Sequence, residues 1–154
     1  MTDMESADEG IAAFAQVTDK TYDQVAQEMG FQRDANGAWL LGPNGAVDCE
    51  FCPWLFRQGI APITITTRDH PSLADLGRAA IGPTQHETRD WIRGHRAVVL
   101  IRDEKSAAIR PDIVPADAFV WDGAQLFDRD GREVDIATLT ICEVVMLLPM
   151  AGGH

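Results

Sequence analysis

The chain has 154 residues, of which 45% are hydrophobic and 24% are charged, with 13 lysine and arginine residues against 24 aspartate and glutamate residues. This composition predicts one ordinary globular domain over 1–154 and excludes a long disordered chain. The net charge of −11 argues against nucleic acid and anionic membranes as direct partners, because like charges repel, and it leaves basic proteins open.

Cysteine usage and the N-terminal stretch bear on location. Three cysteines, an odd number, favour reduced thiols, and the polar, acidic stretch 1–8 does not resemble a secretory signal. The longest apolar run, 144–148, is too short to span a bilayer. We therefore expect a soluble, cytoplasmic protein.

The first half of the chain predicts mainly helices. Segment 10–17 is apolar nearly all round, which is typical of a helix in the middle of a core. Residues 21–29 predict a second helix that opens with a Thr-x-x-Gln capping box and stops at Gly30. After a turn-rich span, we expect a third helix capped at or near Asp48 and ending near Gln58, with Pro53 moving its regular part toward Cys52. We also expect helices over 72–80 and 84–94 and a strand over 63–67.

The second half predicts strands. Segment 96–102 is apolar in its interior and charged at both ends, and 117–121 follows as a second strand. Asp122-Gly123 predicts a two-residue hairpin turn into 124–128, Asp130-Gly131 predicts another turn, and the last strand is expected over 139–148. Helices first and an antiparallel sheet second indicate the α+β class.

Several short motifs agree with one known family. Asp-Glu-Gly-Ile-Ala-Ala at 8–13, followed by a polar break and Thr-Tyr-Asp-Gln-Val at 21–25, resembles the Asp-Cys-Gly-x-Ala-Ala start of the bacteriocin-processing (double-glycine leader) peptidases. The glycine-led strand at 94–101 and the strand pair at 117–128 are similar to that family's central strand and to the pair that carries its histidine and aspartate. The resemblance implies a papain-like fold, in which an N-terminal buried helix and further helices pack on a C-terminal antiparallel sheet.

The resemblance also implies site residues. The family's nucleophile falls on Glu9, its histidine base on Asp117, its orienting acid on Asp128 and its oxyanion-assisting glutamine near Asp3. A carboxylate is a poor nucleophile toward amides and a weak base at neutral pH, so the chain is expected to be a degenerate member without peptidase activity. In a papain-like geometry, Glu9, Asp117 and Asp128 would converge on one cleft beside the N-terminus of the first helix.

Metal and redox sites are not expected from the remaining motifs. Cys49-x-x-Cys52 lacks the further ligands of a zinc site and the βαβ context of a redox pair, so both cysteines are expected on a buried helix face. The four histidines show no ligand spacing, and no cofactor is expected. A hard cation held by the carboxylate cluster stays open.

Three functions remain open at this point. The first is a catalytically inactive papain-like domain that binds a peptide or protein partner through the former active-site cleft, with Trp39, Trp54 and His95 as candidate contacts. The second is an enzyme whose three carboxylates perform acid–base chemistry on a small molecule. The third is an acidic decoy that binds a basic protein. The ligand, the oligomeric state and the pathway are not determined by the sequence.

Overall fold

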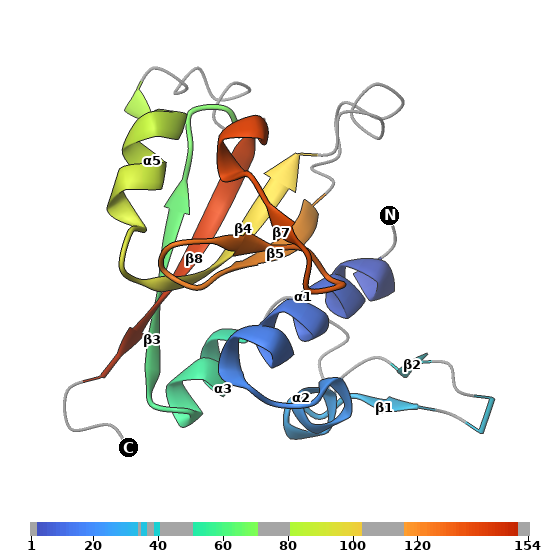
Figure 1. Ribbon diagram of the computed structural model, residues 1–154. Coiled ribbons are helices and arrows are strands. Elements are labelled where there is room, and N and C mark those ends of the chain that lie inside the picture. Colours follow the sequence, from blue (N-terminus) through green and yellow to red (C-terminus); the bar gives the residue numbers. More distant parts are fainter. Residues whose placement is uncertain are drawn as a thin grey trace.

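A computed structural model describes residues 3–33, 35–36, 39–40, 51–70, 81–102 and 116–150, and for 3–9, 32–33, 39–40, 102 and 116 it describes the backbone alone. The protein is of the α+β class, with helices on both faces of an antiparallel sheet (Figure 1). Within these residues, no helix has the length and apolar character needed to cross a membrane.

The first helix, α1 (Asp3–Thr18), begins earlier than the sequence predicted. Its buried residues recur at Ile11, Phe14 and Val17, so one face of the helix lies in the core. Asp19 has a positive φ of 61° and the Lys20 N–H donates to the Ala15 carbonyl at 2.9 Å, which ends the helix.

The second helix, α2 (Tyr22–Glu28), confirms the predicted cap at Thr21. The Thr21 hydroxyl accepts a hydrogen bond from the Gln24 N–H at 3.1 Å, and Gly30 follows the helix with a φ of 88°. Val25 is buried against α1. A short ribbon of β1 (Gln32–Arg33) and β2 (Trp39–Leu40) comes next.

The third helix, α3 (Phe51–Arg57), leads directly into β3 (Ile60–Thr66) through Gly59, whose φ is 78°. Pro53 lies in the first turn of α3, where a backbone N–H needs no partner within the helix. Cys52 is exposed, so its predicted burial was wrong; Cys49 lies outside the described residues.

Helix α5 (Gln85–Trp91) confirms the prediction made from Thr84. Thr84 and Glu87 form a complete capping box, in which the hydrogen bonds from Thr84 hold the pKa of the Glu87 carboxyl below its ordinary value. Gly94, with a φ of 84°, ends this region. The helix predicted over 72–80 lies outside the described residues.

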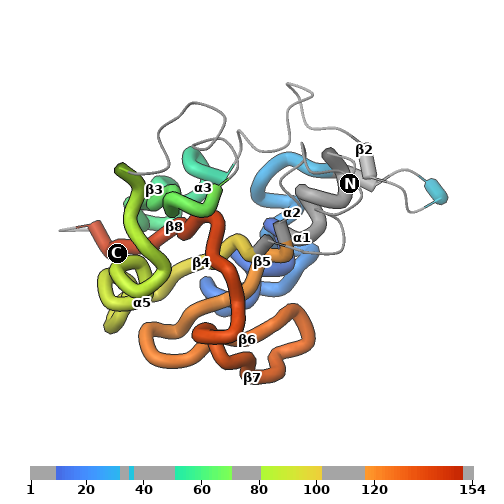
Figure 2. The backbone as a smooth tube through the Cα atoms, turned by 90° about the horizontal axis from the view of Figure 1, so that it is seen from above, coloured from blue at the N-terminus to red at the C-terminus, as the bar shows by residue number. Residues whose placement is uncertain are grey.

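The main sheet has the strand order β3-β8-β4-β5-β6-β7, and every pair in it is antiparallel. The strands not yet defined are β4 (Arg96–Arg102), β5 (Ala116–Trp121), β6 (Leu126–Phe127), β7 (Glu133–Val134) and β8 (Ile141–Pro149). Figure 2 shows β3 at one end of this sheet and β7 at the other.

The turn between β5 and β6 differs from the prediction. It spans four residues, 122–125, instead of two, because the Asp122 carboxylate accepts hydrogen bonds from the N–H groups of Ala124 (2.8 Å) and Gln125 (2.7 Å). Gly123 has a φ of 108°, and its carbonyl accepts from the Gly94 N–H at 2.8 Å. A Cβ at Gly123 would come within 3.3 Å of the Gly94 backbone, so the glycine at 123 permits this close approach.

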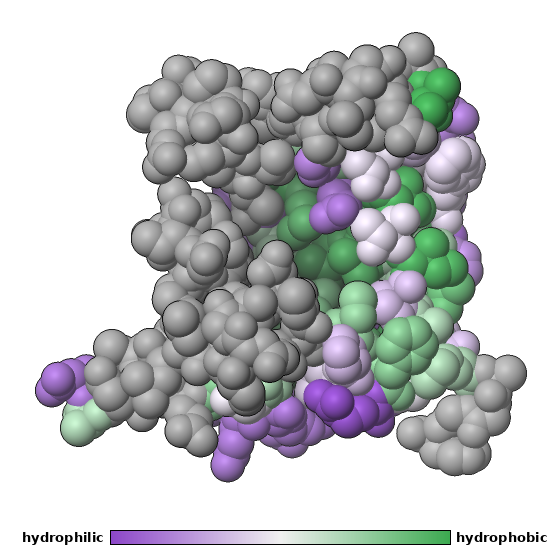
Figure 3. Space-filling model, turned by 180° about the vertical axis from the view of Figure 1, so that it is seen from behind, coloured by the Kyte–Doolittle hydropathy of each residue, from purple (hydrophilic) through white to green (hydrophobic). Residues whose placement is uncertain are grey.

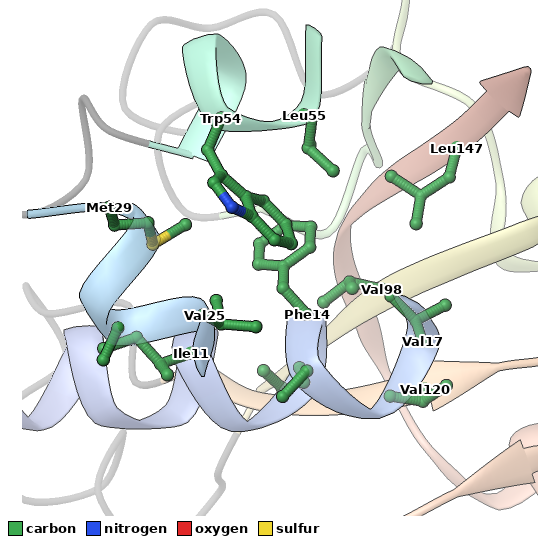
Figure 4. Packing of buried hydrophobic residues seen from close by; sticks show 14 of the residues in the cluster. Ile11, Phe14, Val17, Val25, Met29, Trp54, Leu55, Val98, Val120 and Leu147 are labelled. Carbon is green, nitrogen blue, oxygen red and sulfur yellow. The ribbon is translucent and has the colours of Figure 1, made fainter. Parts of the chain in front are cut away.

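The two faces of the sheet carry separate cores. On one face, Val98, Ala118, Val120 and Leu147 pack with α1, α2 and α3. Figure 4 shows Phe14 of α1 and Trp54 and Leu55 of α3 on the same side of the sheet as Val98, Val120 and Leu147. On the other face, the buried residues of the second core pack near α5 and the β6–β7 hairpin; they are Ile92, Ala97, Val99, Ile101, Trp121, Leu126, Ile141 and Val144. The strict alternation along β4 and β5 follows from the period of two in a strand.

Strand β3 forms an edge of the sheet, because no described strand pairs with its second side. The Thr67 N–H donates to the Cys142 carbonyl and the Gly59 carbonyl accepts from Met150, so the odd-numbered residues of β3 face β8. By alternation, the backbone groups of Pro62, Thr64 and Thr66 point to the free side. Proline is tolerated at an edge when its missing N–H faces away from the ladder, as Pro62 does here.

Candidate functional site

Glu9 does not lie at a helix N-terminus. Helix α1 starts at Asp3, so Glu9 is six residues inside it, roughly 9 Å along the axis from the first residue. The helix dipole acts mainly within the first turn. The electrostatic setting that favours a reactive group in a papain-type nucleophile position is therefore not present at residue 9.

Asp117 lies on the sheet face away from α1. Its neighbours Ala118 and Val120 pack with α1, whereas Phe119 and Trp121 belong to the second core. Asp117 has the parity of Phe119 and Trp121 and pairs across the strands with Ile101, another member of the second core. The side chain of Asp117 therefore leaves the sheet on the side opposite to the first helix.

The carboxylate of Asp128 forms hydrogen bonds within its own turn. Its carboxylate accepts hydrogen bonds from the N–H groups of Asp130 and Arg132, both at 2.9 Å, and this stabilises the predicted turn at Gly131. Its carbonyl accepts a bond from the Gln16 side chain at 3.4 Å. Gln16 is about two helical turns beyond Glu9, roughly 10 Å along α1. The structure does not bring the three carboxylates to one cleft.

The predicted binding residues are also placed differently. Trp54 has an exposed fraction of 0% and packs edge-on against Phe14, with ring centroids 6.3 Å apart, so it is a core residue and not a surface contact (Figure 4). His95 is exposed at the start of β4, beside Arg96, which donates to the Val17 carbonyl at the C-terminal end of α1. Trp39 lies in β2, where only the backbone is described.

Two shallow pockets flank Arg96 at the C-terminal end of α1. Their volumes are about 320 and 190 Å³, and both are lined by Val17 and Arg96. Lys20 lines the larger one, while Asp19 and Asp122 line the smaller one, so the charges are mixed. Because the Arg96 guanidinium is bonded to a terminal helix carbonyl, we interpret this region as a helix C-cap and not as a binding site.

A more distinctive surface lies on the α1 side of the sheet, next to the edge strand. Beyond the part that α1 and α3 cover, Thr64 is exposed and the other residues described on this face are half-buried. We call this surface the β3 hollow and define it by Thr64, Thr66, Leu100, Glu143 and Val145. Strand β3 forms the rear edge of the sheet in the view of Figure 1. Figure 3, which shows the molecule from behind, shows a hollow with hydrophobic residues at its bottom.

Glu143 is the charged member of the β3 hollow. It sits in the central strand β8, between Leu100 of β4 and Thr66 of β3. Partial burial raises the pKa of its carboxyl above the ordinary value, although the field of His70 and a hydrogen bond from Thr66 act in the opposite direction. A carboxyl group with a raised pKa, surrounded by apolar side chains and hydroxyls, is a candidate functional group.

The regular alternation of β8 sets the direction of Glu143. Glu143 pairs with Leu100 and follows the first-core side, whereas its neighbour Val144 faces the second core. The β4–β8 register shifts just beyond this pair, between Leu100 and Ile101, so Ile141 also faces the second core. The backbone of Ile141 is held by Gln85, whose amide accepts from the Ile141 N–H at 2.7 Å and donates to the Ile141 carbonyl at 2.8 Å.

Sequence reasoning missed Glu143, although a signal was present. The run Ile-Cys-Glu-Val-Val-Met-Leu-Leu at 141–148 contains one carboxylate in an otherwise apolar strand. A charge in a central strand is costly unless that face stays partly open or offers polar partners. The predicted strand alone did not reveal which face of the sheet is covered. Glu143 was therefore not recognised as a candidate site residue.

Among the residues that the structure describes, no group of histidine, cysteine, aspartate or glutamate side chains is arranged to hold a metal ion. Cys142 is buried in β8, and Cys52 lies exposed on α3. Comparison with family models, with curated proteins and with solved structures gave no match. The fold and the site thus define an α+β domain with a partly apolar hollow beside an open sheet edge.

The raised pKa of Glu143 predicts a pH-dependent stability. Between the ordinary glutamate pKa of 4.5 and the raised value, the folded state binds the proton more tightly than the unfolded state does. The contribution of Glu143 to stability therefore falls as the pH rises through this window. Relative to the wild type, Glu143→Gln should gain stability from acidic to neutral pH. Urea unfolding at a series of pH values measures the difference, and a difference that stays constant with pH would contradict the prediction.

Proposed function

We propose that this protein is a papain-like domain without peptidase chemistry that binds a peptide or protein segment in the β3 hollow. The architecture supports the family resemblance in outline, since a buried first helix packs on a later antiparallel sheet. The binding surface in this proposal is the β3 hollow, because Glu9, Asp117 and Asp128 are set apart from one another.

One observation carries the proposal: Glu143 is an ionisable side chain in the central strand β8, on the part of the sheet face that the described helices leave partly open. Apolar side chains beside it, Leu100 and Val145, provide contact area, and Thr64 and Thr66 provide hydroxyl groups. Binding sites combine an apolar lining with a few placed polar groups in this way.

The other two functions have less support. Acid–base catalysis by a carboxylate cluster needs groups within reach of one substrate, and Asp117 and Asp128 are directed to different places. A decoy for basic proteins rests on the net charge of −11 alone. That charge is also compatible with the hollow, since it would attract a basic segment toward Glu143.

The proposal is tested with dodecapeptides selected from a phage-displayed random library on the whole protein. Thr64→Arg places a long charged side chain over the β3 hollow, whereas Ile63→Arg alters the neighbouring exposed residue on the opposite face. Thr64→Arg should weaken the affinity of the selected peptides at least about tenfold, and Ile63→Arg should leave it within about threefold. Fluorescence anisotropy measures both. Equal affinities for wild type and Thr64→Arg would contradict the proposed site.

A further inference from the structure

The free side of β3 offers hydrogen-bonding groups directly beside the β3 hollow. The N–H and C=O groups of Thr64 and Thr66 point away from β8, and no described strand pairs with them. Pro62 lacks an N–H on the same side, so it limits pairing to the second half of the strand. The available edge is thus short and lies next to Glu143, which pairs with Thr66 in the register of β3 and β8.

We propose that the partner is an extended basic segment that adds as a strand to β3 at Thr64 and Thr66. This segment directs a lysine or arginine side chain to Glu143. The inference rests on the proposed function. In strand addition, backbone hydrogen bonds supply affinity and alternate side chains supply specificity. The side chains of an added strand that have the parity of Thr66 would point into the β3 hollow.

The dimensions fit this assignment. Glu143 lies one strand away from Thr66, and an added strand would lie one strand away on the other side, so the two backbones are separated by roughly 10 Å. An extended lysine or arginine side chain and the Glu143 side chain together span this separation between the two backbones. The side chain of Thr66, which lies between them, is small enough to allow this contact. The alternate residue of the segment beside Thr64 would point toward Val145, which favours an apolar side chain there.

Charge identifies the partner as basic. The chain carries 24 acidic against 13 basic residues, and Glu143 is the acidic group on the described part of the hollow. Thr66 already donates a hydrogen bond to Glu143, and a cationic side chain from the segment would complete the pairing of this partly buried carboxylate.

The experiment uses the selected dodecapeptides on the whole protein. Thr64→Pro removes the free-edge N–H, while Thr64→Val keeps it and has a similar side-chain volume. We expect Thr64→Pro to weaken binding at least about tenfold and Thr64→Val to leave it within about threefold. Pro62 shows that this side of the strand accepts proline. As a second measurement, N-methylation along the peptide should weaken binding at alternate positions only.

Glu143→Gln tests the charged contact against Glu133→Gln, which makes the same charge change on the opposite edge strand, β7. Glu143→Gln should remove the preference for a lysine over a glutamine in the peptide, and Glu133→Gln should retain it. Equal effects of the two variants would overturn the assignment of the basic contact.

The outcomes separate this inference from the function on which it rests. Peptides that bind Thr64→Pro and Thr64→Val equally, yet fail on Thr64→Arg, would occupy the hollow without pairing to the edge and would overturn strand addition alone. A concentration-dependent dimer that Thr64→Pro abolishes would assign the edge to a second copy of the chain and would also overturn it. Loss of affinity with Thr64→Pro, together with the alternate N-methylation pattern, would support it.

Discussion

Trp54→Ala is expected to lower the free energy of unfolding by about 3–5 kcal/mol, because it leaves a cavity where a fully buried indole contacts Phe14. The same change at Trp91, whose exposed fraction is 49%, should alter stability by no more than about 0.5 kcal/mol. Urea unfolding of both variants measures the difference. A loss at Trp54 no larger than that at Trp91 would contradict its place in the core.

Trp54→Phe separates packing from the polar group of the indole. The indole N–H of Trp54 is buried and has no hydrogen-bond acceptor among the described residues. Phenylalanine keeps an aromatic ring beside Phe14 and removes the buried donor, so the expected loss is below about 2 kcal/mol. Because Trp54 is a core residue, Trp54→Phe should leave the affinity of selected peptides unchanged.

The second large effect is expected at Gln85. Its side chain satisfies both the N–H and the carbonyl of Ile141, a residue with an exposed fraction of 0%. Gln85→Ala leaves these two backbone groups without their partner, at a cost of about 2–4 kcal/mol. Gln85→Glu retains an acceptor for the N–H but cannot donate to the carbonyl and lies next to Asp69, so it should also destabilise.

The matched control for this prediction is Gln125→Ala, at an exposed position in the turn after β5. Its effect should stay within about 0.5 kcal/mol. If Gln85→Ala unfolds at the same urea concentration as Gln125→Ala, the amide does not hold the bulge. The role assigned to Gln85, holding the Ile141 backbone at the bulge, would then be wrong.

Local signals predicted much of the fold. The sequence predicted the helix caps at Thr21 and Thr84 and the glycines that follow these helices. These features depend only on residues a few positions apart, so sequence patterns can predict them. The strand 96–102 was predicted with its observed bounds, since its apolar interior and charged ends need no tertiary information.

The start of the first helix was placed too late because the predicted helix was limited to the apolar segment 10–17. The residues before it, Asp-Met-Glu-Ser-Ala-Asp at 3–8, are compatible with a helix start, where acidic residue types are favoured by the dipole. The prediction of a two-residue turn at Asp122 was wrong because its carboxylate accepts hydrogen bonds from two following N–H groups, which lengthens the loop.

The site could not be predicted because tertiary packing decides which face of each strand is covered. In 117–121, apolar residues occupy both parities, so the sequence does not tell which side meets the first helix. The same holds for Glu143, because the apolar residues of 141–148 also occupy both parities and the sequence does not tell which of them meets the first helix. Only the packing of two cores shows which positions remain open.

The most direct test of the central claim is to map a bound dodecapeptide by amide chemical-shift changes in NMR. Binding in the β3 hollow predicts the largest changes at Thr64, Thr66, Glu143 and Val145, with little change at Arg96 and Val17 around the shallow pockets. Changes centred on Arg96, with β3 and β8 unaffected, would contradict the account.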